Sequence, residues 1–122
     1  MRASLGWDGP GDCGPKRAAA LGPHAGMGHL HFGGGSPNAL AAEDFKSLVA
    51  HARAAFGEHA GLEVAVEVDP RTLTPEFIHA MAEAGVSRVS FGVQTLAPKV
   101  QEAVGRLQPR ELLVDGVERL RA

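Results

Sequence analysis

Cysteine is almost absent from this sequence of 122 residues, in which Cys13 is the single example. One cysteine cannot form a disulfide within the chain, and it cannot complete a metal site built from cysteine ligands. No stretch approaches the roughly 18 consecutive apolar residues that cross a bilayer, and Arg2 is not followed by an apolar run typical of a signal peptide. We therefore expect a protein of the reducing cytoplasm with no membrane association.

An excess of charge of either sign is also missing. The formal net charge is −2, and 44% of the residues are hydrophobic and 21% charged, as in an ordinary globular protein. This balance argues against a nucleic-acid partner, which would favour a basic surface. No nucleophile elbow is present and no phosphate-binding lysine follows the glycine run, so hydrolase and P-loop functions are disfavoured.

Residues 1–27 and 28–122 differ in composition. The first segment is crowded with glycine, proline and alanine and has no sustained helical or strand period, so we expect a poorly ordered leader. The second segment alternates strand-like and helix-like stretches in the order β-α-β-α-β-α-α. Helices of this length between strands predict parallel strands and an α/β fold, either an open sheet or part of a barrel. The expected strands are 29–32, 62–68 and 86–93, and the expected helices are 41–56, 74–85, 98–104 and 109–122.

Each expected strand ends in polar residues or glycines. The first strand runs into Gly33–Pro37, the second contains Glu67 and Asp69 at its end, and the third leads into Gly92–Gln94. Parallel strands bring their carboxyl ends to one edge, where α/β proteins bind ligands. The combination of bare backbone amides, carboxylates and a carboxamide suits a polar small molecule with an amino group and ribose hydroxyls.

Each of these features also has an ordinary structural interpretation. Three successive glycines are more often a tight turn than a ligand cradle, and the spacing G-x-G-x-x-G is missing. Asp69 precedes a proline and suits a turn or a cap, whereas Gln94 suits a loop. Glu67 lies between apolar residues of an expected buried strand, so it requires a partner or a ligand.

The histidines do not predict a metal site. His29 and His31 share a strand face, but no third convergent ligand follows from the sequence. The others are expected on the surface; they are His24, His51, His59 and His79.

Three motifs together resemble one known family. The stretches 29–37 (HLHFGGGSP), 66–71 (VEVDPR) and 89–95 (VSFGVQT), the last followed by 100–108 (VQEAVGRLQ), are similar in order and spacing to segments of radical S-adenosylmethionine (SAM) coproporphyrinogen oxidases. The resemblance covers the chain from about residue 28 to its end. It implies three βα units of a partial (β/α)6, TIM-like barrel.

The resemblance further implies a function. Oxygen-independent coproporphyrinogen III oxidases use a [4Fe–4S] cluster to cleave SAM, and the radical so formed leads to decarboxylation of substrate propionates to vinyl groups in porphyrin and haem biosynthesis. By position, Gly34, Gly35 and Ser36 would contact the methionyl part of SAM. Glu67, Gln94 and Arg106 would bind its other polar groups. We assign no catalytic side chain and no metal ligand to this segment.

Two alternatives remain open. The radical SAM haem chaperones share the glycine, glutamate and Gly-Val-Gln motifs, so a haem-binding function is the nearest alternative. Residues 69–71 and 100–108 look more like the oxidase branch. A non-functional remnant of a truncated gene is the second alternative.

One departure from the family generates a prediction. The cluster-binding motif C-x-x-x-C-x-x-C is missing, and Cys13 does not replace it. We expect this chain alone to be an inactive fragment, because without three thiolates no cluster should assemble. Anaerobic incubation with iron and sulfide should give no cluster absorbance, and a stable [4Fe–4S] spectrum would contradict the prediction.

Overall fold

The computed structural model describes residues 26–121, so the predicted leader lies outside the described residues except for its last two positions. Met27 is buried and already belongs to the first strand. The order of helices and strands is the predicted one. The bounds are β1 Met27–Phe32, η1 Pro37–Ala39, α2 Ala42–Phe56, β2 Glu58–Val68, η2 Pro70–Thr72, α3 Pro75–Glu83, β3 Arg88–Phe91, α4 Pro98–Ala103 and α5 Arg110–Arg121, where η1 and η2 are 3-10 turns.

The three strands form one sheet in the order β1-β2-β3, and both pairs are parallel, as predicted. In the register, Val66 of β2 lies opposite Phe32 of β1 and Val89 of β3. The carboxyl ends of all three strands therefore meet at one edge of the sheet, which we call the carboxyl edge.

Local sequence explains where the helices begin and end. The Thr74 hydroxyl accepts a hydrogen bond from the Phe77 amide at 3.2 Å, and Pro75 occupies the first turn of α3. Gly57 follows the last residue of α2 and has a positive φ of 69°, a backbone conformation that residues with a side chain rarely adopt.

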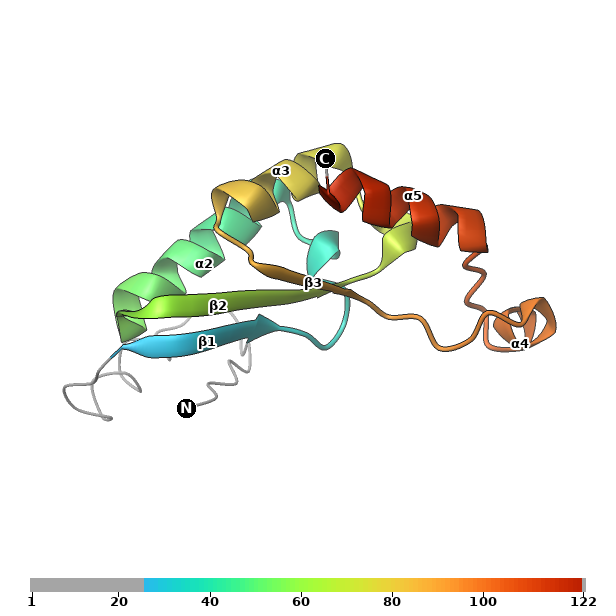
Figure 1. Cartoon of the computed structure of the whole chain (residues 1–122), viewed down its shortest axis with the longest axis horizontal. Helices are drawn as coiled ribbons and strands as arrows, with labels where there is room; N and C mark the ends of the chain where they lie inside the picture. Colours follow the sequence, from blue (N-terminus) through green and yellow to red (C-terminus); the bar gives the residue numbers. More distant parts are fainter. Residues whose placement is uncertain (1–25, 122) are drawn as a thin grey trace.

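Helices α2, α3 and α5 lie over one face of the sheet, whereas α4 lies beyond the carboxyl edge (Figure 1). The core forms between α2, α3 and this face. Phe45 of α2 is fully buried there, with its ring 5.3 Å from that of Phe32 and 5.0 Å from that of Phe77, measured between centroids. Alternate residues of β2, namely Val64, Val66 and Val68, complete the core from below.

Helix α5 approaches β3 closely. Leu112, Leu113 and Leu120 are half-buried, and Val117 is exposed. Gly116 is buried, and an added Cβ there would lie 3.0 Å from the Phe91 ring. The close approach of β3 therefore selects the smallest residue of this helix.

Within residues 26–121, no helix is both long enough and apolar enough to cross a membrane.

The assigned core predicts which substitutions lower the stability. Phe45→Ala should lower the free energy of unfolding by about 3–5 kcal/mol, since it removes a large buried ring and leaves a cavity. Leu40→Ala should change it by less than about 0.5 kcal/mol, because Leu40 is 44% exposed. Urea denaturation of both variants measures the difference, and equal losses would contradict the assigned core.

Candidate functional site

A small pocket lies at the carboxyl edge. Its lining comes from the ends of all three strands and from the loop after α4: Gly35, Ser36, Glu67, Val68, Asp69, Gly92 and Arg106. Its volume is about 30 Å3, whereas small-molecule pockets usually measure roughly 300–1,000 Å3. A hollow of this size would hold only part of a ligand of nucleoside size.

Four of the six residues predicted from the sequence line this pocket, namely Gly35, Ser36, Glu67 and Arg106. The lining does not include Gly34 or Gln94, and Gln94 is exposed on the loop after β3. The sequence indicated Asp69 as a turn or cap residue, and it does cap η2: its carboxylate accepts a hydrogen bond from the Arg71 amide. Asp69 also lines the pocket.

The three glycines after β1 are needed for different reasons. Gly34 and Gly35 have φ of 77° and 67°, which side chains rarely adopt, and the space where their Cβ atoms would lie is open. At Gly33 the constraint is space, because an added Cβ would lie 2.6 Å from His31 Nε2. The same position is 3.6 Å from Glu67 Oε2, so the imidazole and the carboxylate face one gap that Gly33 leaves free.

Glu67 is exposed, so the expectation that it lies buried is wrong. Alternation along β2 explains the difference. Val66 and Val68 face the helices, so Glu67 points to the opposite face of the sheet, over which no described helix lies. On the third strand Gly92 also leaves room, since an added Cβ there would lie 3.4 Å from Glu67 Oε1. The carboxylate thus stands between two positions without side chains and is open to a ligand.

The guanidinium of Arg71 neutralises the carboxylate of Asp69. Arg71 donates from Nη2 to Asp69 Oδ2 at 2.6 Å and from Nε to both carboxylate oxygens at 3.0 and 3.1 Å. These hydrogen bonds hold the pKa of the Asp69 carboxyl below its ordinary value of 3.8. Residues 26–121 provide no salt-bridge partner to Glu67 or to Arg106, so one carboxylate and one guanidinium remain available at the pocket.

A buried amide joins the loops that follow the first two strands. Asn38 donates from Nδ2 to the Asp69 carbonyl and to Thr72 Oγ1, both at 2.9 Å, and its Oδ1 accepts from the Asp69 amide at 3.0 Å. The side chain thereby holds Asp69 beside Ser36 and Gly35. Sequence reasoning missed Asn38, because an asparagine after a proline in a glycine-rich loop is usually a surface turn residue.

Surface positions were predicted for four histidines, and the structure describes three of them. His51, His59 and His79 are exposed, and His29 pairs with Glu63, with 3.1 Å between Nε2 and Oε1. Across the described range, no three His, Cys, Asp or Glu side chains are placed to hold a metal ion. His24 lies outside the described residues.

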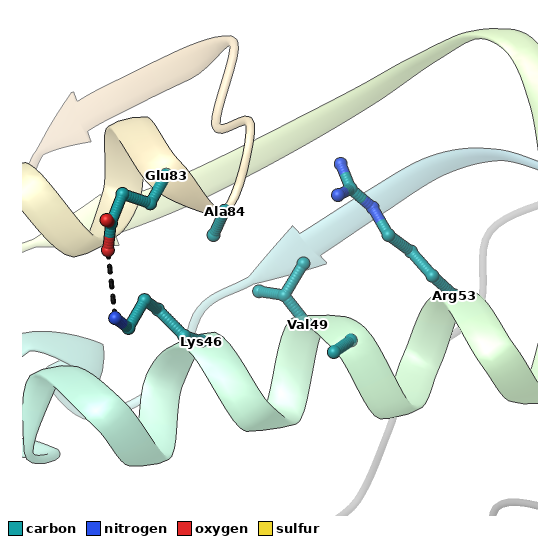
Figure 2. A pocket seen from close by; sticks show the side chains of 6 residues that line it. Lys46, Val49, Arg53, Glu83 and Ala84 are labelled. Atoms are coloured by element: carbon teal, nitrogen blue, oxygen red, sulfur yellow. Dashed lines mark hydrogen bonds and ion pairs between the residues drawn. The ribbon is translucent and has the colours of Figure 1, made fainter.

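A larger hollow of about 320 Å3 lies between α2 and the end of α3. Figure 2 shows Lys46 and Glu83 joined across it, with 2.8 Å between Nζ and Oε2, and Val49 pointing into it. No predicted site residue lines this hollow. We interpret it as the groove between two packed helices.

Comparison with known proteins places the chain in a family. The family model of the radical SAM superfamily matches residues 15–122. This chain belongs to the radical SAM superfamily. Membership of the radical SAM superfamily, which the resemblance of the three motifs implied, is thus confirmed.

Individual relatives agree with this assignment. The chain is 44% identical over 104 residues to the oxygen-independent coproporphyrinogen III oxidase of Bradyrhizobium diazoefficiens, covering 85% of this chain and 23% of that protein. The enzyme of the same name from Paracoccus denitrificans is 36% identical over 103 residues, with 84% and 23% covered. The solved structure of coproporphyrinogen III oxidase (HemN) from Escherichia coli, a radical SAM enzyme, superposes with a TM-score of 0.70 at 32% identity, over 77% of this chain and 22% of that one. The chain thus spans about a quarter of the length of these relatives.

The superfamily uses SAM together with an iron–sulfur cluster, and the residues present suit these two groups differently. Open space beside Gly34 and Gly35, an unpaired carboxylate at Glu67 and a guanidinium at Arg106 fit the polar groups of SAM. The cluster does not fit, because a sequence with one cysteine cannot supply three thiolates.

The Asp69–Arg71 pair predicts a pH dependence. The depressed pKa of Asp69 means that the pair stabilises the fold above about pH 3.8 and loses this contribution as the pH falls through the lower pKa of the folded state. Asp69→Asn should therefore reduce the stability at pH 7 and change it little at pH 2. Thermal unfolding at both pH values measures this, and a loss that is equal at the two would contradict it.

Proposed function

We propose that this chain supplies part of the SAM-binding wall of an oxygen-independent coproporphyrinogen III oxidase, an oxidoreductase of cytoplasmic porphyrin and haem biosynthesis. One observation carries the proposal: residues expected to bind SAM, from the ends of β1 and β2 and from the loop after α4, line a single pocket. The names of the relatives support the choice of substrate, coproporphyrinogen III. The complete activity belongs to a protein of the relatives' length, of which this chain corresponds to about a quarter.

The charges at the pocket favour a ligand with both an ammonium and a carboxylate. Asp69 is neutralised by Arg71, so Glu67 and Arg106 remain as single charges of opposite sign. In the proposed site Glu67 accepts hydrogen bonds from the amino group or the ribose hydroxyls of SAM, and Arg106 pairs with the methionyl carboxylate. Such a pairing orients the amino-acid part of the ligand along the carboxyl edge.

The glycine loop and Gln94 complete the proposed contacts. The backbone at Gly34 and Gly35 can approach a ligand closely because no Cβ stands in the way. Ser36 adds a hydroxyl at the pocket, and Gln94 adds an amide from the exposed loop after β3.

SAM, when bound, would supply the radical chemistry by which the proposed enzyme acts on the propionate groups of its substrate. The residues of this chain position SAM and take no covalent part.

Titration calorimetry with SAM tests the binding site. Glu67→Gln should weaken binding about 10-fold, since a charge-assisted hydrogen bond becomes a neutral one. Glu63→Gln is the matched control, because Glu63 lies four residues earlier on the same strand and is paired with His29 and Arg88. Equal affinities of the unsubstituted chain and Glu67→Gln would refute the assignment of Glu67.

The substrate requires a separate test on the longer protein that contains this segment. Under anaerobic conditions with SAM and a reductant, it should convert coproporphyrinogen III to protoporphyrinogen IX. Tight haem binding without conversion would contradict the oxidase assignment.

A further inference from the structure

The polar side chains that are buried in residues 26–121 are all carboxamides. They are Asn38, Gln101 and Gln108, with exposed fractions of 8%, 5% and 3%. Burial of an amide is unfavourable unless its hydrogen bonds are replaced, so each must have a structural partner. The two glutamines lie on either side of Arg106, which lines the pocket.

Gln101 contacts the chain both before and after Arg106. Its side-chain Nε2 donates to the Thr95 carbonyl at 2.8 Å and to the Gln108 carbonyl at 3.0 Å, and its Oε1 accepts from the Gln108 amide at 3.0 Å. Three of the four hydrogen bonds that a glutamine side chain can make are thus used on the backbone.

The backbone of Gln101 fixes Arg106 directly. Its carbonyl accepts a hydrogen bond from the Arg106 amide at 2.9 Å, and the Gly105 amide donates to the Glu102 carbonyl at 3.1 Å. With φ of 67° at Gly105, this is the Schellman arrangement that ends a helix. Arg106 is therefore held through its own amide and, two residues later, through Gln108.

Gln108 connects this turn to the sheet. Its Nε2 donates to the carbonyl of Gly92 at 3.4 Å, and Gly92 lies at the end of β3 and lines the pocket. The segment that carries Arg106 is thus tied to the carboxyl edge by a side-chain hydrogen bond.

Hydrophobic packing does not hold this segment in place. Its large apolar side chains are mostly exposed, at 60% for Leu96, 48% for Val100, 56% for Val104 and 56% for Leu107. A helix as short as α4, with 6 residues, is not stable alone. The side-chain hydrogen bonds of the two buried amides therefore add to the backbone hydrogen bonds of the turn in fixing its geometry.

We propose that Gln101 and Gln108 are positioning residues that hold the turn carrying Arg106 against the pocket, so that its guanidinium can bind the carboxylate of SAM. The inference rests on the proposed SAM site and adds the means by which one of its charges is fixed. Binding would otherwise have to order a mobile arginine on a mobile loop, at an entropic cost that weakens the affinity.

A double-mutant cycle on the full 122-residue chain tests the proposal, with SAM as the probe and calorimetry as the measurement. Arg106→Ala should weaken SAM binding by roughly 10- to 100-fold, the usual effect of a lost charge-assisted hydrogen bond. Gln101→Met should weaken it about 10-fold, because Arg106 loses its fixed position. Once Arg106 is alanine, Gln101→Met should cost less than about 2-fold, since it acts through the arginine. Additive losses, or no loss in Gln101→Met, would overturn the proposal.

A second variant and a control separate positioning from loss of folding. Gln108→Met removes the Gly92 hydrogen bond and leaves the bonds from Gln101 intact, so it should fold and weaken binding about 3-fold. Val49→Ala removes a buried core methyl pair far from the pocket and should lower the stability without changing the affinity of the folded chain. A similar loss of affinity in Val49→Ala would assign the effect to stability and overturn the proposal.

The result also distinguishes failure of the site from failure of this inference. If the unsubstituted chain does not bind SAM, the proposed function and the inference both fall. If it binds and the glutamine variants bind equally well, only the inference falls.

Discussion

Parallel pairing of β2 with both of its neighbours is the constraint on which the site depends. Because the strands run the same way, the loops after β1, β2 and β3 all emerge at one edge. Because side chains alternate along β2, one face of the strand packs against the helices and the other faces the candidate site. Its valines bury one face against the helices, and Glu67 stands on the other face, at the edge where a ligand can reach it.

Buried carboxamide side chains fix the loops that follow the strand ends. Asn38 joins the loop after β1 to the loop after β2, and Gln101 with Gln108 joins the turn after α4 to the end of β3. A carboxamide suits this task because it donates and accepts at once and so satisfies both groups of a peptide unit. The loops around the pocket are therefore held by side-chain hydrogen bonds where few apolar side chains are buried.

The sequence predicted the α/β order, the parallel sheet and much of the pocket, for two separate reasons. Hydrophobic periodicity and glycine positions located the helices and strands, whereas the resemblance to a family added Arg106, which no strand end indicated. Periodicity could not reveal that Glu67 is exposed, because alternation does not say which face of a sheet is covered. Nor could it identify Gln101, since a glutamine on a short polar helix is most often a surface residue.

The contact between Gly33 and His31 has a consequence for how this segment can vary among relatives. The imidazole occupies the space that a side chain at position 33 would need, with 2.6 Å between Nε2 and the position of an added Cβ. The two positions should therefore covary: a side chain at position 33 requires the exposed His31 imidazole to rotate away, whereas a smaller residue at 31 accepts alanine at 33 without a change. This steric coupling constrains one glycine of the run independently of any backbone dihedral angle.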